Sequence, residues 1–174
     1  MFYIDIAFQL MDRMKLEGVQ PNTHIFNMAI TLCARCNMPE KGYELFLAMD
    51  RAGLKRDVVT YNACLDAICT NIPLARSIFQ EGVKIGFYSK VSRLGDNWLE
   101  LDLHFMSLGG GEIAFWWWFQ ECLVEYMVNS DKLSQVKSIN IVTGTGKSRQ
   151  RSQVEGSSIF MYSNRLYHGT HSYS

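Results

Sequence analysis

Apolar residues recur every three or four positions through the first half of the chain, and this spacing predicts amphipathic helices. Four such segments lie between residues 25 and 86, at 25–33, 39–49, 58–70 and 73–86. Pro39 and Pro73 stand at helix starts, where the backbone N–H that proline lacks has no helical partner. Gly53 follows the second segment and favours a left-handed helix end. The first half is therefore expected to be all helical.

The second half changes to the period of two that a β-strand requires. Residues 98–105 (WLELDLHF) alternate in this way, and a second strand-like run begins at Val136. One helical segment, 111–128, lies between the two runs. A strand, a crossover helix and a parallel strand form a βαβ unit, in which the carboxyl ends of both strands meet at one edge. The expected fold class is therefore α + α/β, a helical solenoid followed by a small βαβ domain.

An internal repeat organises the helical half. Met14, Gly18, Asn22 and the pair Phe26–Asn27 recur 35 positions later as Met49, Gly53, Asp57 and Tyr61–Asn62. A fixed period of this length is typical of stacked helix-turn-helix units, each of which buries its apolar face against its neighbours.

The repeat resembles the pentatricopeptide repeat, whose consensus contains VVTYN and a later Met, Gly and Pro-Asp. Residues 57–62 (DVVTYN) and 18–22 (GVQPN) stand close to that consensus, and the resemblance covers Ile4 to about Lys90. It implies single-stranded RNA binding, one base per repeat, and an organellar location in the chloroplast or mitochondrion. The chain begins inside the periodic pattern, so we expect a fragment of a longer array, and no transit peptide is visible.

In that family the fifth and last residues of each repeat read the base. The complete repeat, 23–57, would use Asn27 and Asp57, a combination that the family associates with uridine, and the next repeat would offer Asn62 with Lys90. Asn and Asp can bond to a base edge while apolar neighbours sandwich the base. The alternative is that the two asparagines only cap or solvate helices.

Two motifs in the second half resemble those of the Smr (small MutS-related) domain, which binds nucleic acid and in several members cleaves DNA or RNA. Residues 101–104 (LDLH) match its LDLHG-type motif, and Thr143–Gly144–Thr145–Gly146 match its TGxG motif. Phe105 replaces the usual Gly, and Ser148–Arg149 replace the usual His-Ser. The resemblance covers about Leu99 to Lys147 and implies a nucleic-acid-binding domain, incomplete at its carboxyl end.

Any nuclease activity is expected at Asp102 and His104. Asp102 can bind a hard metal ion, Mg²⁺ or Mn²⁺, or position water, and His104 can act as general base or acid near neutral pH. Glycine N–H groups of the turn Gly144–Thr145–Gly146, with Lys147 and Arg149, would hold phosphate. The alternative is that Asp102 and His104 only hold the turn, which leaves a domain that binds RNA, or DNA, without cleaving it.

A protein-interaction scaffold with a non-catalytic second domain is the rival function, because helical solenoids also present concave surfaces to peptides. Basic residues on that surface would favour RNA, and an exposed apolar groove would favour a protein partner. The formal net charge is zero, so no overall basic field indicates a nucleic-acid partner. Acidic residues dominate 99–136 and basic residues 144–174. No apolar run has the length of about 20 residues that a membrane helix needs.

The remaining features concern packing and boundaries. The five cysteines are expected to be reduced and buried, in preference to a zinc site formed by Cys33, Cys36, Cys64 and Cys69. The aromatic run 115–119 is expected in the core, in preference to a base-stacking platform. We expect helical repeats at 1–90, a connector at 91–98, the second domain at 99–151 and a divergent, partly disordered tail at 152–174.

Overall fold

The computed structural model describes residues 2–95, 97–124, 128, 135–143 and 150–155. The chain divides into two compact units. The first contains Met1–Tyr88 with Met106–Ile113, and the second contains Ser89–Phe105 with the residues from Ala114 onward.

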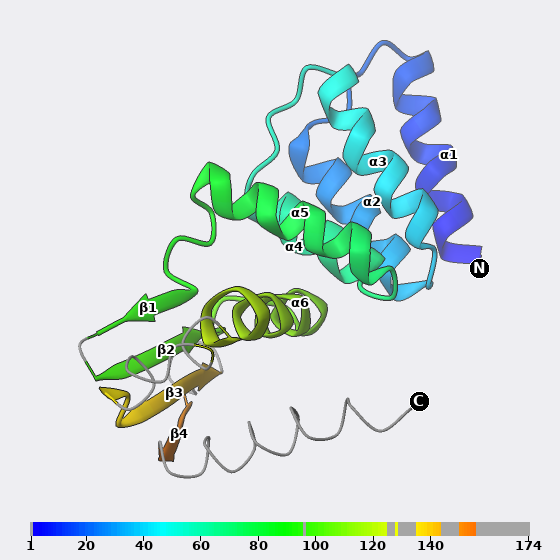
Figure 1. The fold of residues 1–174 in the computed structure, drawn as a ribbon. Helices are drawn as coiled ribbons and strands as arrows, with labels where there is room; N and C mark the ends of the chain where they lie inside the picture. Colours follow the sequence, from blue (N-terminus) through cyan, green and yellow to red (C-terminus); the bar gives the residue numbers. More distant parts are fainter. Residues whose placement is uncertain (1, 96, 125–127, 129–134, 144–149, 156–174) are drawn as a thin grey trace, which may run out of the picture. The chain divides into compact units, whose positions relative to one another are not determined.

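Five helices follow one another in the first unit (Figure 1). They are α1 (Phe2–Leu16), α2 (Thr23–Arg35), α3 (Pro39–Arg51), α4 (Val58–Ile68) and α5 (Ile72–Ile85). Helix α2 packs against both α3 and α4, and α4 packs against α5. The four helices expected from the apolar spacing are all present, in the stacked hairpin arrangement that the 35-residue period predicts.

Helix ends lie where the local sequence places them. The side chain of Asn22 caps α2, and Asp57 caps α4 by accepting from the Thr60 backbone N–H at 2.8 Å. The Thr60 hydroxyl in turn accepts from the Asp57 N–H, which completes a reciprocal capping box. Gly53 (φ +68°) and Gly86 (φ +97°) take the left-handed conformation that ends a helix, which residues with a Cβ adopt at a cost.

A four-stranded sheet forms the second unit. Its strands are β1 (Ser92–Leu94), β2 (Trp98–Asp102), β3 (Ser138–Thr143) and β4 (Gln150–Glu155), in the spatial order β1-β2-β3-β4. Strands β2 and β3 are parallel, and the two outer pairs are antiparallel. The parallel pair confirms the βαβ connection, because Asp102 lies opposite Val142 and both strands end at the same edge.

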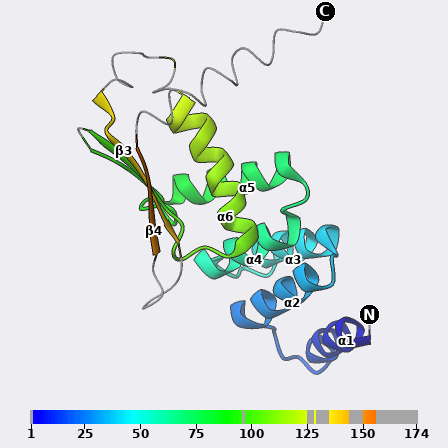
Figure 2. The same cartoon turned by 90° about the horizontal axis from the view of Figure 1, so that it is seen from below.

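Helix α6 (Leu108–Trp118) supplies the crossover and continues as a π-helix, η1 (Phe119–Leu123). The described part of the crossover from Ala114 to Leu123 belongs to the same unit as the sheet and runs beside it (Figure 2). Leu99 and Leu101 of β2 are fully buried, as is Trp118 of α6. Glu100 and Asp102 alternate with those leucines and therefore lie on the opposite face of the sheet.

The structure departs from the expected boundaries in four places. Strand β2 ends at Asp102, because the chain turns at His104, so the expected strand 98–105 is too long. The crossover helix begins at Leu108, three residues before the expected start. Strand β1 lies inside the stretch expected as a connector, and β4 continues to Glu155, beyond the expected end of the domain. Both outer strands have polar sequences without an alternating apolar pattern, so the sequence did not predict them. They are identified by their pairing with β2 and β3.

Candidate nucleic-acid interface

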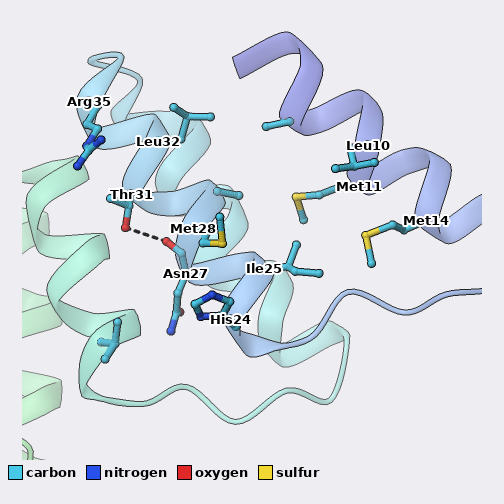
Figure 3. Close-up of a pocket in the computed structure, with 13 residues that line it drawn as sticks. Leu10, Met11, Met14, His24, Ile25, Asn27, Met28, Thr31, Leu32 and Arg35 are labelled. Atoms are coloured by element: carbon cyan, nitrogen blue, oxygen red, sulfur yellow. Dashed lines mark hydrogen bonds between the residues drawn. The ribbon is translucent and has the colours of Figure 1, made fainter. Parts of the chain in front are cut away.

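A groove of about 610 Å³ opens along α2 in the first unit (Figure 3). Leu10, Met11 and Met14 of α1 face Ile25, Met28 and Leu32 of α2 across it, and the side near α4 includes His24, Asn27, Thr31, Arg35 and Val59. The α1 side is therefore apolar, whereas the α4 side carries the polar groups.

A buried polar network forms the α4 side of the groove. The Asn27 amide nitrogen donates to Asp57 Oδ1 at 3.3 Å, and the Thr60 hydroxyl lies 2.8 Å from Asn27 Oδ1. Asn27 is 7% exposed and Thr60 fully buried, whereas Asp57 is exposed. The structure thus brings together the two residues expected to read one base, although they are 30 positions apart in the sequence. Thr60 was missed, and its place three residues after Asp57, at the N3 position of the capping box, is the signal that could have indicated it.

Hydrogen bonds keep Asp57 ionised. Partial burial raises the pKa of its carboxyl group, but the backbone and hydroxyl of Thr60, the Asn27 amide and the Val59 backbone together outweigh burial and lower the pKa below its usual value. The network therefore holds a negative acceptor at the surface, beside an amide that can both donate and accept.

Exposed side chains flank this network at equivalent positions of successive repeats. His24 and Val59 are 35 residues apart, and both line the groove and are exposed. A flat ring such as a nucleobase can lie between an imidazole and an aliphatic side chain while its edge meets Asn27 and Asp57. Arg35 contributes the one formal positive charge among the groove-lining residues.

Asn62 is held by a tyrosine. The Tyr88 hydroxyl donates to Asn62 Oδ1 at 2.9 Å, and Asn62 is half-buried. Burial raises the pKa of Tyr88, so the phenol remains a neutral donor at physiological pH. Lys90, the residue expected to read a base together with Asn62, is an exposed residue of the second unit.

Asp102 and His104 meet at the carboxyl end of β2. One carboxylate oxygen of Asp102 contacts His104 Nδ1 and also accepts from the His104 backbone N–H at 3.3 Å. Its other oxygen lies 3.3 Å from Nη2 of Arg93, whose Nη1 donates to Glu100 Oε1 at 3.0 Å. Arg93 of β1 was not expected in this cluster, because only the antiparallel register Arg93–Glu100 brings it there.

The surroundings of Asp102 do not fit the expected Mg²⁺ or Mn²⁺ site. One oxygen is committed to an imidazole and the other to a guanidinium, and the carboxylate is 2% exposed. A divalent ion needs several free oxygen ligands. The described residues also contain no group of three or more His, Cys, Asp or Glu side chains able to hold a metal. The four cysteines of the alternative zinc site are among these residues, so they do not form such a group either.

The phosphate-binding turn lies outside the described residues. This concerns Gly144, Thr145, Gly146, Lys147 and Arg149. Thr143 is described, as the exposed last residue of β3, one position beyond the partner of Asp102. The strand before the turn therefore ends beside the Asp102 carboxylate, as the topology predicted.

The aromatic run is divided between core and surface. Trp118 is 1% exposed, whereas Trp116 is 48% exposed and contacts the rings of Phe115 and Phe119. A core position is thus confirmed for Trp118 and wrong for Trp116. Cys33 and Cys64 are buried free thiols, as expected, and burial raises their pKa values to about 11 and about 12. The free thiols Cys36 and Cys69 are only half-buried, so a buried position is wrong for these two. Among the described residues, no helix is long and apolar enough to cross a membrane.

Two family models of helical repeats match the first unit of the chain. A model described as PPR repeat family matches residues 21–70, and one described as Pentatricopeptide repeat domain matches residues 4–35. Together these matches span α1 to α4 and include Asn27 and Asp57, and they do not extend to the sheet. No curated protein matches the chain.

Proposed function

Since residues 4–70 carry pentatricopeptide repeats, we propose that this protein binds single-stranded RNA along α2 and α4, with one base held at Asn27 and Asp57. Repeats of this family generally bind RNA. The observation that carries the proposal is the direct hydrogen bond between Asn27 and Asp57 at the edge of a groove flanked by His24 and Val59. An organellar location, in the chloroplast or mitochondrion, belongs to the same proposal by family resemblance.

Charge and hydrogen-bonding capacity support uridine at this position. Uridine presents an N3–H donor between two carbonyl acceptors, and a paired carboxylate and amide can satisfy a donor and an acceptor together. The Asp57 carboxylate is the acceptor, and the Asn27 amide supplies the adjacent polar group. Cytidine, which has no N3–H, would leave the carboxylate facing an acceptor.

The test measures binding of the full chain to labelled six-nucleotide homopolymers by fluorescence anisotropy at low salt. Oligouridine should bind more tightly than oligocytidine and oligoadenine, and more tightly than duplex DNA. Asp57→Asn keeps a good helix-capping residue but replaces the carboxylate, so it should reduce the preference for uridine by about tenfold, roughly the cost of one lost hydrogen bond to a charged group.

Asp12→Asn is the matched control for that variant. Asp12 lies on α1, is exposed, forms an ion pair with Lys15 at 3.6 Å and does not line the groove, so the same charge change should leave RNA binding unaltered. Equal affinity for all three homopolymers and for duplex DNA, or equal losses in the two variants, would refute base reading at Asp57.

A second candidate function is RNA cleavage by the second unit, and the Asp102–His104 contact favours it. An aspartate on Nδ1 orients the imidazole and leaves Nε2 to exchange protons. Because the Asp102 surroundings do not fit a divalent ion, we propose a reaction in which the nucleophile belongs to the substrate. His104 removes the 2′-OH proton, O2′ bonds to phosphorus, and the P–O5′ bond breaks as the leaving oxygen takes a proton from water. An Smr-like role for this unit is part of the same proposal.

A single-turnover assay with excess chelator tests this second function. RNA should be cut to 2′,3′-cyclic phosphate and 5′-hydroxyl ends, whereas the DNA analogue, which lacks the 2′-OH, should remain intact. Loss of general-base catalysis in His104→Ala should slow cleavage about 10²–10⁴-fold, and Asp102→Asn should slow it as well. Cleavage of the DNA analogue, or undiminished cleavage by both variants, would rule out this mechanism.

A further inference from the structure

The apolar side of the groove on α1 and α2 can be compared with the equivalent surface of the next repeat, on α3 and α4. The groove-lining positions of α1 and α2 have equivalents 35 residues later, in α3 and α4, except that the equivalent of Arg35, Thr70, lies just beyond α4. Leu10 is 59% exposed and Met28 is 60% exposed, whereas their equivalents, Leu45 and Ala63, are 8% and 6% exposed. The same two positions of the repeat are therefore open once and covered once within the same unit.

Helix α2 makes the difference, because it packs against both α3 and α4. A Cβ added to Gly42 on α3 would lie 3.4 Å from the Cβ of Cys33 on α2, so the two helices approach closely there. Gly42 is the equivalent of Ala7 in the groove. Asn27 of α2 bonds to Thr60 on α4, the equivalent of Ile25 in the groove. Helix α2 therefore covers, on α3 and α4, the surface that is equivalent to the open groove on α1 and α2.

We infer that the α1–α2 groove is the docking site for an amphipathic helix of a partner helical hairpin, which packs there as α2 packs on α3 and α4. The groove continues the existing α2–α4 packing interface by one repeat period. This inference goes beyond RNA binding and does not depend on it, because it uses the α1 side of α2 and not the Asn27–Asp57 edge (Figure 3).

Charge and shape define the partner helix. The residues that line the groove include one formal charge, Arg35, and no carboxylate. In the covered interface, Asn27 of α2 bonds to Thr60 of α4. The position equivalent to Thr60 in the groove is Ile25, which has no polar group in its side chain, so a polar residue of the partner helix at the place of Asn27 would have no hydrogen-bond partner there. The buried face of the partner helix should therefore be uncharged and apolar at i, i+3, i+4 and i+7, with large residues to contact Leu10 and Met28.

A hairpin that copies residues 21–55 of this chain is the probe, since its first helix has the face that already covers the equivalent site. Labelled hairpin should bind the full chain saturably in fluorescence anisotropy. Met28→Asp and Leu10→Asp, at positions already exposed to solvent, should weaken binding at least about tenfold, because a buried carboxylate would have no partner. Ile85→Asp on α5, a residue 55% exposed, is the matched control and should bind as the parent does.

A second form of the experiment keeps the inference testable if the isolated hairpin does not fold. Residues 21–38 are placed directly before Ile4, which is the position equivalent to Pro39, so that the added helix precedes α1 as α2 precedes α3. Covering the groove should raise the melting temperature of the chain by about 5 °C, and Met28→Asp should remove that increase. No binding together with no increase in melting temperature would overturn the inference. So would equal weakening by Ile85→Asp, or sedimentation as a dimer that Met28→Asp dissociates, which would identify the occupant as a second copy.

Discussion

At the scale of single residues, Asn27 shows how a buried amide becomes tolerable. Its side chain is almost inaccessible to solvent, and an amide buried without partners costs several kcal/mol. Here the amide nitrogen donates to Asp57 and the oxygen faces the Thr60 hydroxyl, so both ends are satisfied. The same three residues cap α4 and join it to α2, which makes any base-reading function inseparable from the packing of two repeats.

Asp57→Ala should lower stability at neutral pH by about 1 kcal/mol, the usual cost of removing a helix cap. The folded-state pKa of Asp57 is lowered, so its contribution is present above the unfolded pKa, about 3.9, and is lost as the pH falls through the folded value. The difference between parent and variant should therefore shrink between pH 7 and pH 3 in thermal or urea unfolding.

Asn22→Ala is the matched control, because Asn22 caps α2 at the equivalent position without a titrating group. Its cost should also be about 1 kcal/mol, but it should stay constant over the same pH range. If both penalties change equally with pH, the titrating group is not Asp57.

Burial should also divide the thiols into two classes. Cys33 and Cys64 are fully buried with raised pKa values, and thiolate is the reactive form, whereas Cys36 and Cys69 are half-buried. Iodoacetamide at pH 8 should modify Cys36 and Cys69 at least about tenfold faster, and peptide mapping by mass spectrometry would measure this. Equal rates at all four positions in the folded protein would contradict the burial of Cys33 and Cys64.

At the scale of elements, the start of α6 depends on glycine. The Gly109 backbone N–H donates to Asp66 Oδ1 at 3.0 Å, and a Cβ on Gly109 would lie 2.8 Å from that oxygen and 3.1 Å from the Asp66 Cα. A Cβ on Gly111 would meet nothing closer than Met106 at 3.9 Å. Three successive glycines are poor helix formers, and the first of them is required by the close approach of two backbones.

Gly109→Ala and Gly111→Ala should therefore change stability in opposite directions. Overpacking at Gly109 should cost about 1–3 kcal/mol, while alanine at Gly111, inside the helix and in open space, should add about 0.5–1 kcal/mol. Urea unfolding of the two variants provides the comparison. Stabilisation by alanine at both positions would show that α6 does not approach Asp66 in solution.

At the scale of the whole molecule, the number of phosphate contacts determines how RNA binding should respond to salt. Each phosphate contact contributes a slope of about −0.7 to a plot of log K against log salt for single strands. Arg35 is the one formally charged residue that lines the groove, so the chain should show a shallow slope, close to that of one or two phosphates.

Arg35→Gln should make that slope shallower by about 0.7, the contribution of one phosphate. Arg51, also exposed and in the last turn of its helix, lies on α3 away from the groove, so Arg51→Gln should leave the slope unchanged. Anisotropy titrations with oligouridine between 50 and 300 mM salt would measure both. A steep slope that neither variant alters would place the main phosphate contacts outside the groove.

The features that the sequence determined by itself are local or periodic. The 35-residue repeat, the helices from Thr23 to Ile85, their caps and glycine ends, and the parallel pairing of β2 with β3 all follow from spacing, because side-chain periodicity and capping depend on neighbours within a few residues. The proximity of Asn27 to Asp57 was expected only from the resemblance to pentatricopeptide repeats, in which the fifth and last residues of a repeat read one base.

Tertiary structure decided the features that depend on residues far apart in the chain. Thr60 completes the Asn27 network, and Arg93 joins Asp102 through the pairing of β1, a strand with no periodic signal of its own. Met28 and Ala63 occupy the same position of the repeat, yet one is exposed and the other covered. Burial depends on what packs against a side chain, so the periodic sequence assigns both residues to one face, and only the stacking of α2 distinguishes them.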